Sequence, residues 1–467
     1  MDDKVPDRGP CGRRTIGAGL RKTDAWRDPR WLTLTALCLA VLIAQIDTSV
    51  VNLAVRPIGT YFQADIATLQ WVVDAYNLVY AILLLTGGLL ADLYGRRRAF
   101  IAGAGVFTAA SLLCALAPDI SVLIGGRALA GLGAALLLPS SLAIIRVAWP
   151  DSIERGRALG IWASCNGLAL AIGPSVGGLL IGNLGWRSIF LLVVPLGAAA
   201  LTLAAAVIAE TCDPRERRFD AMAQVFGATT LGSLALAAIE VHAARSFALG
   251  AVVVAVVALM LFIRVEQRAG TKALVPLDMF RVPAFNGTVA ATAGMTFGMY
   301  GVLFLLPLTW QSTGMLAPIG VGIALMPSAL IFMVVSPLSG VLVEKLGARL
   351  MISGGVAIVG CGLLVLAATA GLTQVAGAEA GLALTGLGMG LSSGPLFGVA
   401  AANVSAARSG TAGALINVAR MAGATIGVAV LGAAFAAVQG GAAGLRVAML
   451  LGGLVQLICA GIAWRTV

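Results

Sequence analysis

The stretch Gly88-Leu-Leu-Ala-Asp92-Leu-Tyr-Gly95-Arg96-Arg97-Arg98 decides the fold, because it ends a long apolar run with an acid, a turn glycine and three arginines. A weaker copy, Gly340-Val-Leu-Val-Glu344-Lys-Leu-Gly347-Ala-Arg349, follows another apolar run in the second half of the chain. Glycine, acid, glycine and arginine keep their mutual spacing in both copies. A duplicated membrane protein accounts for this pattern, and a soluble enzyme does not.

Composition indicates a protein that lives in lipid. Of 467 residues, 59% are hydrophobic and only 11% are charged, with a mean hydropathy of +0.97. Soluble domains carry about 25% charged residues. Roughly 20 apolar residues cross a bilayer core, and the chain contains about fourteen such runs. Backbone groups in hydrocarbon must bond internally, so these runs predict helices. We expect an all-α polytopic protein of the cell inner (plasma) membrane.

The distribution of basic residues predicts the orientation. With the N-terminus inside, roughly 25 of the 31 Lys and Arg residues fall on the cytoplasmic side. Four arginines fall outside: Arg56, Arg187, Arg245 and Arg446. This asymmetry follows the positive-inside rule, so both termini are expected in the cytoplasm. The net charge of +10 therefore requires no nucleic acid partner.

The order of the spans predicts two six-helix bundles with two extra helices between them. We expect a disordered cytoplasmic tail at 1–30, an N-terminal bundle at 31–208, a linker with two extra transmembrane helices at 209–285, and a C-terminal bundle at 286–467. The first two spans are expected at 31–55 and 70–91. Parallel repeats of six helices are one of the known transporter architectures.

Several chemistries are disfavoured by what the sequence lacks. None of the four lysines follows a glycine, so the phosphate-binding loop G-x-x-x-x-G-K-[ST] is absent and no ATP site is expected. The single histidine and thinly scattered acids form no catalytic or metal-binding spacing. We therefore expect no catalytic residues, no metal and no cofactor.

The motifs resemble those of a known family. The stretch around Asp92 resembles the signature loop of the major facilitator superfamily. Further segments resemble motifs of its fourteen-span drug:proton antiporters, which include quaternary-ammonium exporters. These are Asp47-Thr-Ser-Val-Val-Asn52, Trp71-Val-Val-Asp74-Ala-Tyr76, Arg127-Ala-Leu-Ala-Gly131, Gly173-Pro174-Ser-Val-Gly177-Gly178 and Asn417-Val-Ala-Arg420. The pair Arg56-Pro57 departs from the usual leucine-proline ending of the first motif. The resemblance implies about fourteen transmembrane helices in a major facilitator fold.

Asp47, Arg127 and Asp74 are the candidates for proton coupling. An ionised carboxylate as deep as Asp47 costs several kcal/mol, so it should be protonated, paired or facing a water-filled cavity. We expect Asp47 to interact with Arg127 when ionised and to separate from it when protonated. The alternatives are purely structural roles, with Arg127 joining helices through backbone carbonyls. Asp74 lies near a span end and is either a solvated vestibule acid or, as the resemblance implies, a site of protonation or cation recognition.

The resemblance also suggests residues for the substrate cavity. The candidates are Asn52, Trp71, Tyr76 and Arg420. Trp71 equally fits the aromatic belt at a membrane interface. Arg420 equally fits helix packing with partial stabilisation of an anion. These residues do not identify the substrate.

Two further motifs predict conformational roles. In the loop of Gly88, Asp92 and Gly95, we expect Asp92 to face the N-terminus of a neighbouring helix, where negative charge is favoured. We expect Arg96 and Arg97 to bind helix C-terminal carbonyls across the interface between the halves. Gly173, Pro174, Gly177 and Gly178, which resemble the antiporter motif, predict close packing and a bend at that interface.

The favoured function is a monomeric, proton-coupled exporter of drugs or other small lipophilic compounds, cations among them, working by alternating access. Its partners would be protons, the small-molecule substrate and the lipid bilayer. A proton symporter or facilitator for a small metabolite, and an exporter of an endogenous natural product, remain the alternatives. A membrane enzyme or sensor is disfavoured, because the chain lacks the clustered acids and histidines that such a protein would need.

Overall fold

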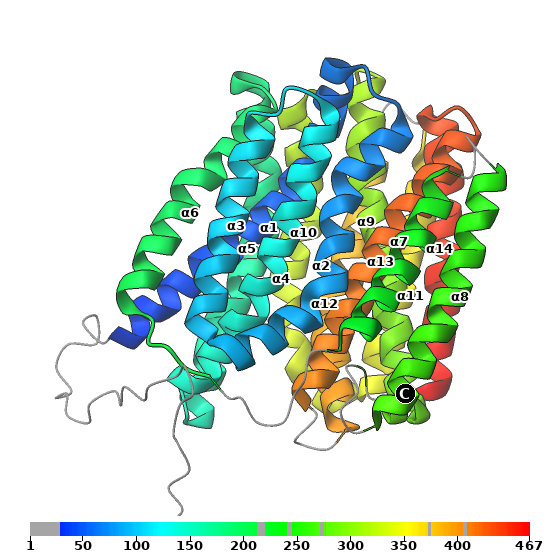
Figure 1. The fold of residues 1–467 in the computed structure, drawn as a ribbon. Coiled ribbons are helices and arrows are strands. Elements are labelled where there is room, and N and C mark those ends of the chain that lie inside the picture. The colour runs from blue at the N-terminus through cyan, green and yellow to red at the C-terminus, as the bar shows by residue number, and fades with distance from the viewer. Residues whose placement is uncertain are drawn as a thin grey trace, which may run out of the picture.

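The computed structural model describes residues 29–212, 220–240, 245–270, 275, 277–371, 375–404 and 409–467. Within these ranges the chain forms fourteen α-helices and the short 3-10 helix η2 (Figure 1). Their bounds are α1 Pro29–Phe62, α2 Ile66–Tyr94, α3 Arg96–Ala115, α4 Ile120–Ala148, α5 Ser152–Leu184, α6 Arg187–Val207, α7 Ala221–Glu240, α8 Arg245–Ala269, η2 Leu277–Arg281, α9 Pro283–Ser312, α10 Pro318–Leu346, α11 Ala348–Thr369, α12 Ala376–Ala402, α13 Ser409–Ala437 and α14 Gly441–Thr466.

Thirteen of these helices are long and apolar enough to cross a membrane, counted over the described residues. The exception is α5, whose apolar part is the shorter segment Ile172–Leu184. Its first turns carry Glu154, Arg155 and Arg157. The sequence prediction of a polytopic all-α membrane protein is confirmed.

The helices are longer than the apolar runs that predicted them. The first span, expected at 31–55, continues in α1 through Pro57 to Phe62. The second begins at Ile66 and not at residue 70, because Asp65 caps it by accepting a hydrogen bond from the Thr68 amide at 2.9 Å. Both changes place the residues in these spans deeper in their helices than the sequence indicated.

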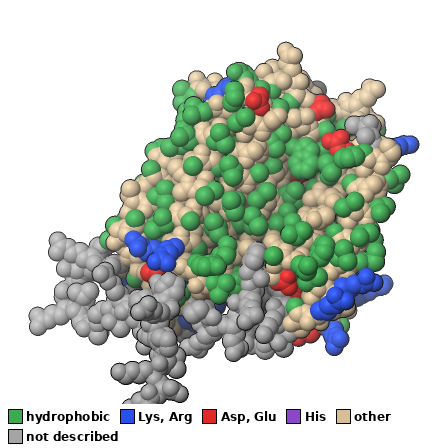
Figure 2. Space-filling model, viewed as in Figure 1, with side chains coloured by type: hydrophobic (Ala, Val, Ile, Leu, Met, Phe, Trp, Pro, Cys, Tyr) green, Lys and Arg blue, Asp and Glu red, His purple; other side chains and the backbone are tan. Residues whose placement is uncertain are grey.

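The bundle has two chemically different ends. We call the end where α1 begins and α14 finishes the terminal end, and the opposite one the distal end (Figure 1). Blue side chains gather at the terminal end, below a broad apolar band (Figure 2). The helix ends there carry Arg96, Arg97, Arg98, Arg155, Arg264, Arg268, Lys345, Arg349 and Arg465, and the distal helix ends carry Arg56, Arg187, Arg245 and Arg446. From this asymmetry we propose that the terminal end faces the cytoplasm.

Packing repeats between the first six and the last six helices. In the first set α4 packs on α2 and α3, while α1 packs on α5 and α6. In the second set α12 packs on α10 and α11, while α9 packs on α13 and α14. The two copies of the opening motif form equivalent turns, with Gly95 at φ 115° between α2 and α3, and Gly347 at φ 81° between α10 and α11. A residue with a Cβ is strained at such φ values.

The two sets meet mainly along two reciprocal contacts, α2 with α13 and α5 with α10, and α1 also packs on α9. Helix α7 packs on α8 and also touches α2 and α13. We propose that these groups are the units expected from the sequence, at 31–208, 209–285 and 286–467. Residues 1–28 of the expected tail lie outside the described residues, and its last two residues already belong to α1. Residues 213–219 of the linker also lie outside them.

Glycines bring helices into backbone contact in both sets. A Cβ on Gly103 of α3 would lie 2.8 Å from the Gly133 carbonyl oxygen of α4. A Cβ on Gly355 of α11 would lie 2.7 Å from the Gly388 oxygen of α12. With no hydrophobic force between helices in lipid, close packing of small residues is a main source of stability.

Adjacent glycines of α2 provide a matched test of this packing. A Cβ on Gly87 would clash with the carbonyl group of Ala135 on α4, whereas one on Gly88 would make only ordinary contact, 3.5 Å from Pro139. We expect Gly87→Ala to destabilise the protein by about 1–3 kcal/mol. Gly88→Ala should leave stability unchanged or raise it by up to about 1 kcal/mol. Thermal unfolding in detergent measures both, and equal midpoints for the two variants would contradict the packing.

Candidate functional site

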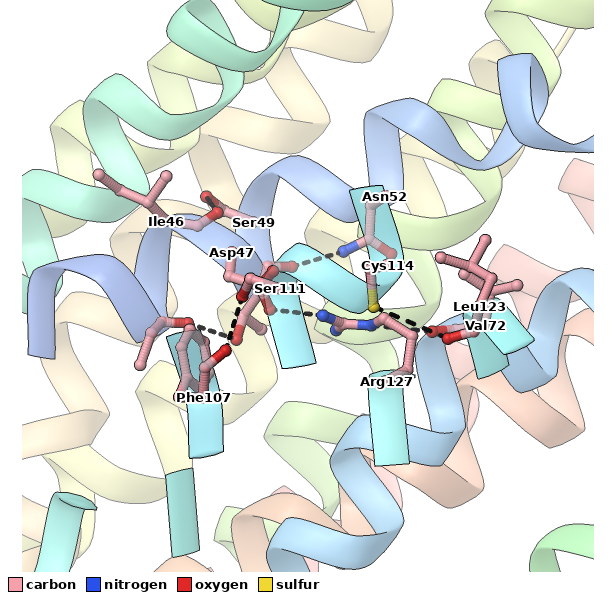
Figure 3. Close-up of polar contacts among 12 residues, drawn as sticks. Ile46, Asp47, Ser49, Asn52, Val72, Phe107, Ser111, Cys114, Leu123 and Arg127 are labelled. Atoms are coloured by element: carbon pink, nitrogen blue, oxygen red, sulfur yellow. Dashed lines mark hydrogen bonds and ion pairs between the residues drawn. The ribbon is translucent and has the colours of Figure 1, made fainter. Parts of the chain in front are cut away.

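An ion pair lies at the centre of the first helix set. The Asp47 carboxylate of α1 and the Arg127 guanidinium of α4 are 2.6 Å apart, from Oδ2 to Nη1 (Figure 3). Only 4% of Asp47 and 2% of Arg127 are exposed. Two charges buried this deeply persist only because they neutralise each other. Two of the three residues that the sequence singled out for proton coupling are thus in direct contact.

Arg127 also binds α2. Its Nε donates a hydrogen bond to the Val72 carbonyl oxygen at 3.1 Å. Its guanidinium carbon lies 4.7 Å from the centre of the Tyr76 ring, a cation–π geometry. The guanidinium therefore joins three helices, α1, α2 and α4. The alternative expectation, that Arg127 staples helices through backbone carbonyls, describes one of its contacts and not the main one.

The α1 surface near Asp47 is polar over about two turns. Asn52 donates from Nδ2 to the Thr48 carbonyl oxygen at 3.0 Å. Its Oδ1 is buried and has no hydrogen-bond partner within the described part of the chain. Asn52, expected to line the substrate cavity, therefore keeps an unused acceptor close to the ion pair.

Asp74 is fully buried, with 0% of its surface exposed. Neither carboxylate oxygen has a hydrogen-bond partner among the residues that the structure describes. The expectation of a solvated vestibule acid is therefore wrong for this conformation, because α2 begins earlier than the apolar run and carries Asp74 further inside. An unpaired ionised carboxylate in such a place costs several kcal/mol. The neutral, protonated acid is the form that fits this site.

Asp74 belongs to a polar stripe of α2 that faces α13. One turn before it, Gln70 donates from Nε2 to the carbonyl oxygens of Val428 at 2.8 Å and Ala429 at 3.0 Å. One turn after it, Asn77 is 1% exposed, and both polar atoms of its side chain lack partners in the described residues. On α13, Thr425 lies one turn from Val428 and its hydroxyl is equally unpartnered there.

Sequence reasoning missed Gln70, Asn77 and Thr425. The spacing of 70, 74 and 77 puts three polar side chains on one face of an otherwise apolar helix, a signal that the helical period would have revealed. The stripe lies on one of the two main contacts between the helix sets, that of α2 with α13.

The remaining cavity candidates lie around the same region. Tyr76 is 3% exposed beneath the Arg127 guanidinium, and Trp71 is half-buried. Arg420 of α13 lies beside the side chains of Tyr80 on α2 and Tyr300 on α9. The structure thus places Arg420 between the two sets and not within the second alone.

The loop after α2 differs from its expected contacts. Asp92 reaches the N-terminus of the neighbouring α3 through the side chain of Arg96, the first residue of that helix, at 2.9 Å. The N-terminus of α3 is instead capped by Glu210, which accepts hydrogen bonds from the amides of Arg97 at 3.1 Å and Arg98 at 3.2 Å. A carboxylate is favoured there by the helix dipole.

Arg97 binds a helix C-terminus, as expected, but not across the interface between the sets. Its Nη2 donates to the Ala205 carbonyl oxygen at 2.7 Å, in the last turn of α6. The expectation of an inter-half contact for this arginine is wrong in this conformation. Glu210 was missed because it follows an apolar run with no motif around it.

The glycines of α5 sit at two helix contacts. A Cβ on Gly173 would clash with Ser49 of α1, and one on Gly177 would clash with Val50. On the opposite side, a Cβ on Gly178 would lie 2.6 Å from the Pro318 carbonyl oxygen of α10. Pro174 lies against Gly322 of α10. The segment that resembles the antiporter motif therefore packs both within the first set and across the interface.

Comparisons with known proteins agree with this architecture. The family model of the Major Facilitator Superfamily matches residues 37–428. The chain is 36% identical over 389 residues to "Multidrug resistance protein Stp" of Mycobacterium tuberculosis, covering 83% of this chain and 72% of that protein. It is 34% identical over 397 residues to "Multidrug efflux pump LfrA" of Mycolicibacterium smegmatis, covering 82% and 77%. It is 32% identical over 430 residues to "Methylenomycin A resistance protein" of Streptomyces coelicolor, covering 84% and 89%.

Solved structures share the fold at much lower identity. A POT family transporter in complex with 5-aminolevulinic acid has a TM-score of 0.71 and 13% identity, over 94% of this chain and 96% of that one. A peptide transporter POT in complex with sulfate has a TM-score of 0.71 and 16% identity, over 93% and 94%. These likenesses concern the fold alone. With two equivalent helix sets, the first of which holds a buried ion pair, and with a family model matched from residue 37 to 428, the chain belongs to the Major Facilitator Superfamily and is a multi-pass membrane transporter.

Proposed function

We propose that this protein exports drugs or other small lipophilic compounds, cations among them, in exchange for protons. The observation that carries the proposal is the buried Asp47–Arg127 pair. A carboxylate held by one guanidinium in a water-poor core changes its contacts sharply when it gains or loses a proton. The names of the relatives, a multidrug resistance protein and a multidrug efflux pump, support drugs as the substrate class.

Protonation of Asp47 would act on the contacts of α1. The neutral carboxyl no longer attracts Arg127, which keeps its bond to the Val72 carbonyl and its place over Tyr76. Helix α1 would then lose its strongest link to α4. Because α1 also packs on α5, and α5 on α10, a shift of α1 reaches the contact between the two sets.

Asp74 would serve a different step. In this conformation it is buried at the contact of α2 with α13 and suits a proton-bearing acid. When the two sets separate along this contact, water reaches the carboxyl and it can ionise. The ionised form would then attract a cationic substrate. One ionised and one protonated carboxyl in the same conformation suit a transporter that exchanges protons for substrate.

The relatives also favour a specific second candidate, export of a natural product. One relative is named a methylenomycin A resistance protein, and another is named "Tetracenomycin C resistance and export protein". The latter, from Streptomyces glaucescens, is 32% identical over 427 residues. Proton-coupled uptake of a metabolite is the other alternative. Everted vesicles with an acidic lumen separate import from export, because an exporter releases lumenal protons when substrate is added outside.

The ion pair provides the first test. In such vesicles we expect Asp47→Asn to reduce substrate-driven proton release at least tenfold, because the asparagine cannot carry a proton. The matched control is Asp65→Asn, an exposed helix cap at the distal end that should transport normally. Undiminished coupled transport by Asp47→Asn would remove this residue from the mechanism.

A second variant separates coupling from folding. Asp47→Asn leaves Arg127 buried without its counter-charge, which costs about 3–5 kcal/mol. Asp47→Asn combined with Arg127→Gln removes both charges and should recover much of the thermal stability. Coupling should stay absent in this double variant, which shows that the loss is not caused by unfolding.

Asp74 provides another test, with two dyes that share one ring system. Asp74→Asn should leave the unfolding temperature almost unchanged, because asparagine resembles the protonated acid in size and carries no charge. Export of the dication propidium should fall at least tenfold, and export of the monocation ethidium should fall less, because an ionised Asp74 attracts the second charge more strongly. Equal losses for both dyes would contradict a role in cation recognition.

A further inference from the structure

Two ionisable side chains on the contact of α2 with α13 have no partner of opposite charge. Asp74 of α2 is fully buried, and neither of its oxygens has a hydrogen-bond partner among the described residues. Arg420 of α13 is half-buried, and no carboxylate lies within ion-pair distance of it in the ranges that the structure describes. Asp47 and Arg127, by contrast, neutralise each other inside the first set. The mechanism proposed above makes no use of Arg420.

The neighbours of Arg420 leave its charge uncompensated. The Tyr80 hydroxyl of α2 is hydrogen-bonded to it and Tyr300 of α9 lies beside it, but both side chains are neutral. Its Nε is buried and has no hydrogen-bond partner in the described part of the chain. A lone charge inside a membrane span is costly, and such residues commonly mark the path of a substrate. For helix packing alone, a neutral side chain of similar size would cost less.

The register of α2 on α13 fixes the distance between the two unpaired groups. Gln70 binds the Val428 carbonyl, and Tyr80, ten residues further along α2, meets Arg420, eight residues back along α13. The two helices therefore run antiparallel. Six residues separate Asp74 from Tyr80. Because an α-helix rises 1.5 Å per residue, the carboxyl and the guanidinium lie about 9 Å apart along the helix axes.

Uncharged hydrogen-bonding groups lie between the two charges. Asn77, one turn from Asp74 towards Tyr80, is 1% exposed, and Thr425 of α13 is 2% exposed. Neither the Asn77 amide nor the Thr425 hydroxyl has a partner among the residues described. A buried polar group without a partner costs about 1–3 kcal/mol, so a polar ligand that reaches these groups recovers that energy.

We propose that this contact takes up an amphoteric cargo, a compound that carries both a cationic nitrogen and an anionic oxyacid group. The nitrogen binds at Asp74, and the acid group, a carboxylate or a sulfonate, binds at Arg420. The inference rests on the proposed export function and narrows its substrate class. In this conformation the contact is closed, and its groups become accessible when the two sets separate along α2 and α13. A simple cation leaves Arg420 unpaired, whereas an amphoteric cargo neutralises both side chains.

Two dyes that differ in one group test the anionic end. Rhodamine B carries a cationic ring system and a free carboxylate, and its ethyl ester carries the same ring system with the acid blocked. Equilibrium dialysis against the same detergent measures binding of each dye to the purified full-length protein. We expect Arg420→Gln to weaken rhodamine B binding at least tenfold, the loss of one charge-assisted hydrogen bond. Binding of the ester should change less than twofold.

Three further variants locate the two ends of the dye. Arg420→Lys keeps the positive charge without the planar guanidinium and should retain part of the rhodamine B affinity. Asp74→Asn should weaken both dyes by a similar factor, because both carry the cation. Arg465→Gln removes an exposed guanidinium from the last turn of α14, outside the contact, and should change neither.

Thermal unfolding in detergent separates this role from helix packing. Arg420→Gln removes an uncompensated charge, so its unfolding temperature should stay the same or rise. A lower unfolding temperature together with equal losses for the two dyes would assign Arg420 to packing and overturn the proposal. Unaltered rhodamine B binding by Arg420→Gln, or no saturable binding of rhodamine B to the unmodified protein, would overturn it as well.

Export is tested separately, because ethidium carries no acid group. Proton release driven by ethidium in everted vesicles, with the dye pair failing the test above, would refute the amphoteric cargo and leave export standing. The expected dye pattern in a protein that releases no protons with either rhodamine B or ethidium would refute export and leave the binding site standing.

Discussion

The Asp47–Arg127 pair is the interaction on which the first helix set depends. It joins α1 to α4, and the same guanidinium holds α2 through the Val72 carbonyl and the Tyr76 ring. Removing one partner from such a pair costs more than almost any single packing contact, because the other charge is left in a medium without water. In the proposed exchange with protons, neutralising the acid would release this link without leaving a lone buried carboxylate, so the strongest contact of the set would also be the one that a proton switches.

The contacts between the two sets include neutral hydrogen bonds and close glycine packing, each weaker than the ion pair. Gln70 binds the Val428 and Ala429 carbonyls across the α2–α13 contact, and Gln311 of α9 binds the Leu53 carbonyl of α1 at 3.0 Å. Neutral hydrogen bonds of this type contribute about 1 kcal/mol each. Glycine contacts such as Gly178 with Pro318 add close packing without any directional bond. Separating an interface made of such weak contacts would cost little free energy. The stronger charged pair would not be broken, because both of its residues belong to the same set.

Much of this arrangement could be predicted from the sequence, for physical reasons that differ by residue. The duplicated turn at Gly95 and Gly347 was readable because only glycine suits its positive φ, and Asp47 with Arg127 because isolated charges in apolar runs need partners. The helix ends could not be predicted, because an apolar run ends at the edge of the hydrocarbon region whereas the helix continues beyond it. Asp74 was placed too near the surface for that reason. Glu210 was missed because its partners, the amides of α3, become neighbours only after folding.

Asp47 and Asp74 have the same side chain in opposite surroundings. Asp47 meets a guanidinium and is stabilised as an anion, whereas Asp74 meets no partner in the described structure and is stabilised as the neutral acid. The difference arises from position, since Asp47 lies inside one helix set and Asp74 lies on the contact between two. In the proposed mechanism, protonation of Asp47 would be felt through its bond to Arg127. Protonation of Asp74 would instead depend on whether the two sets are together, because their separation would admit water to the carboxyl. Protonation and conformation would then be linked at Asp74 by its burial, with no dedicated partner among the described residues.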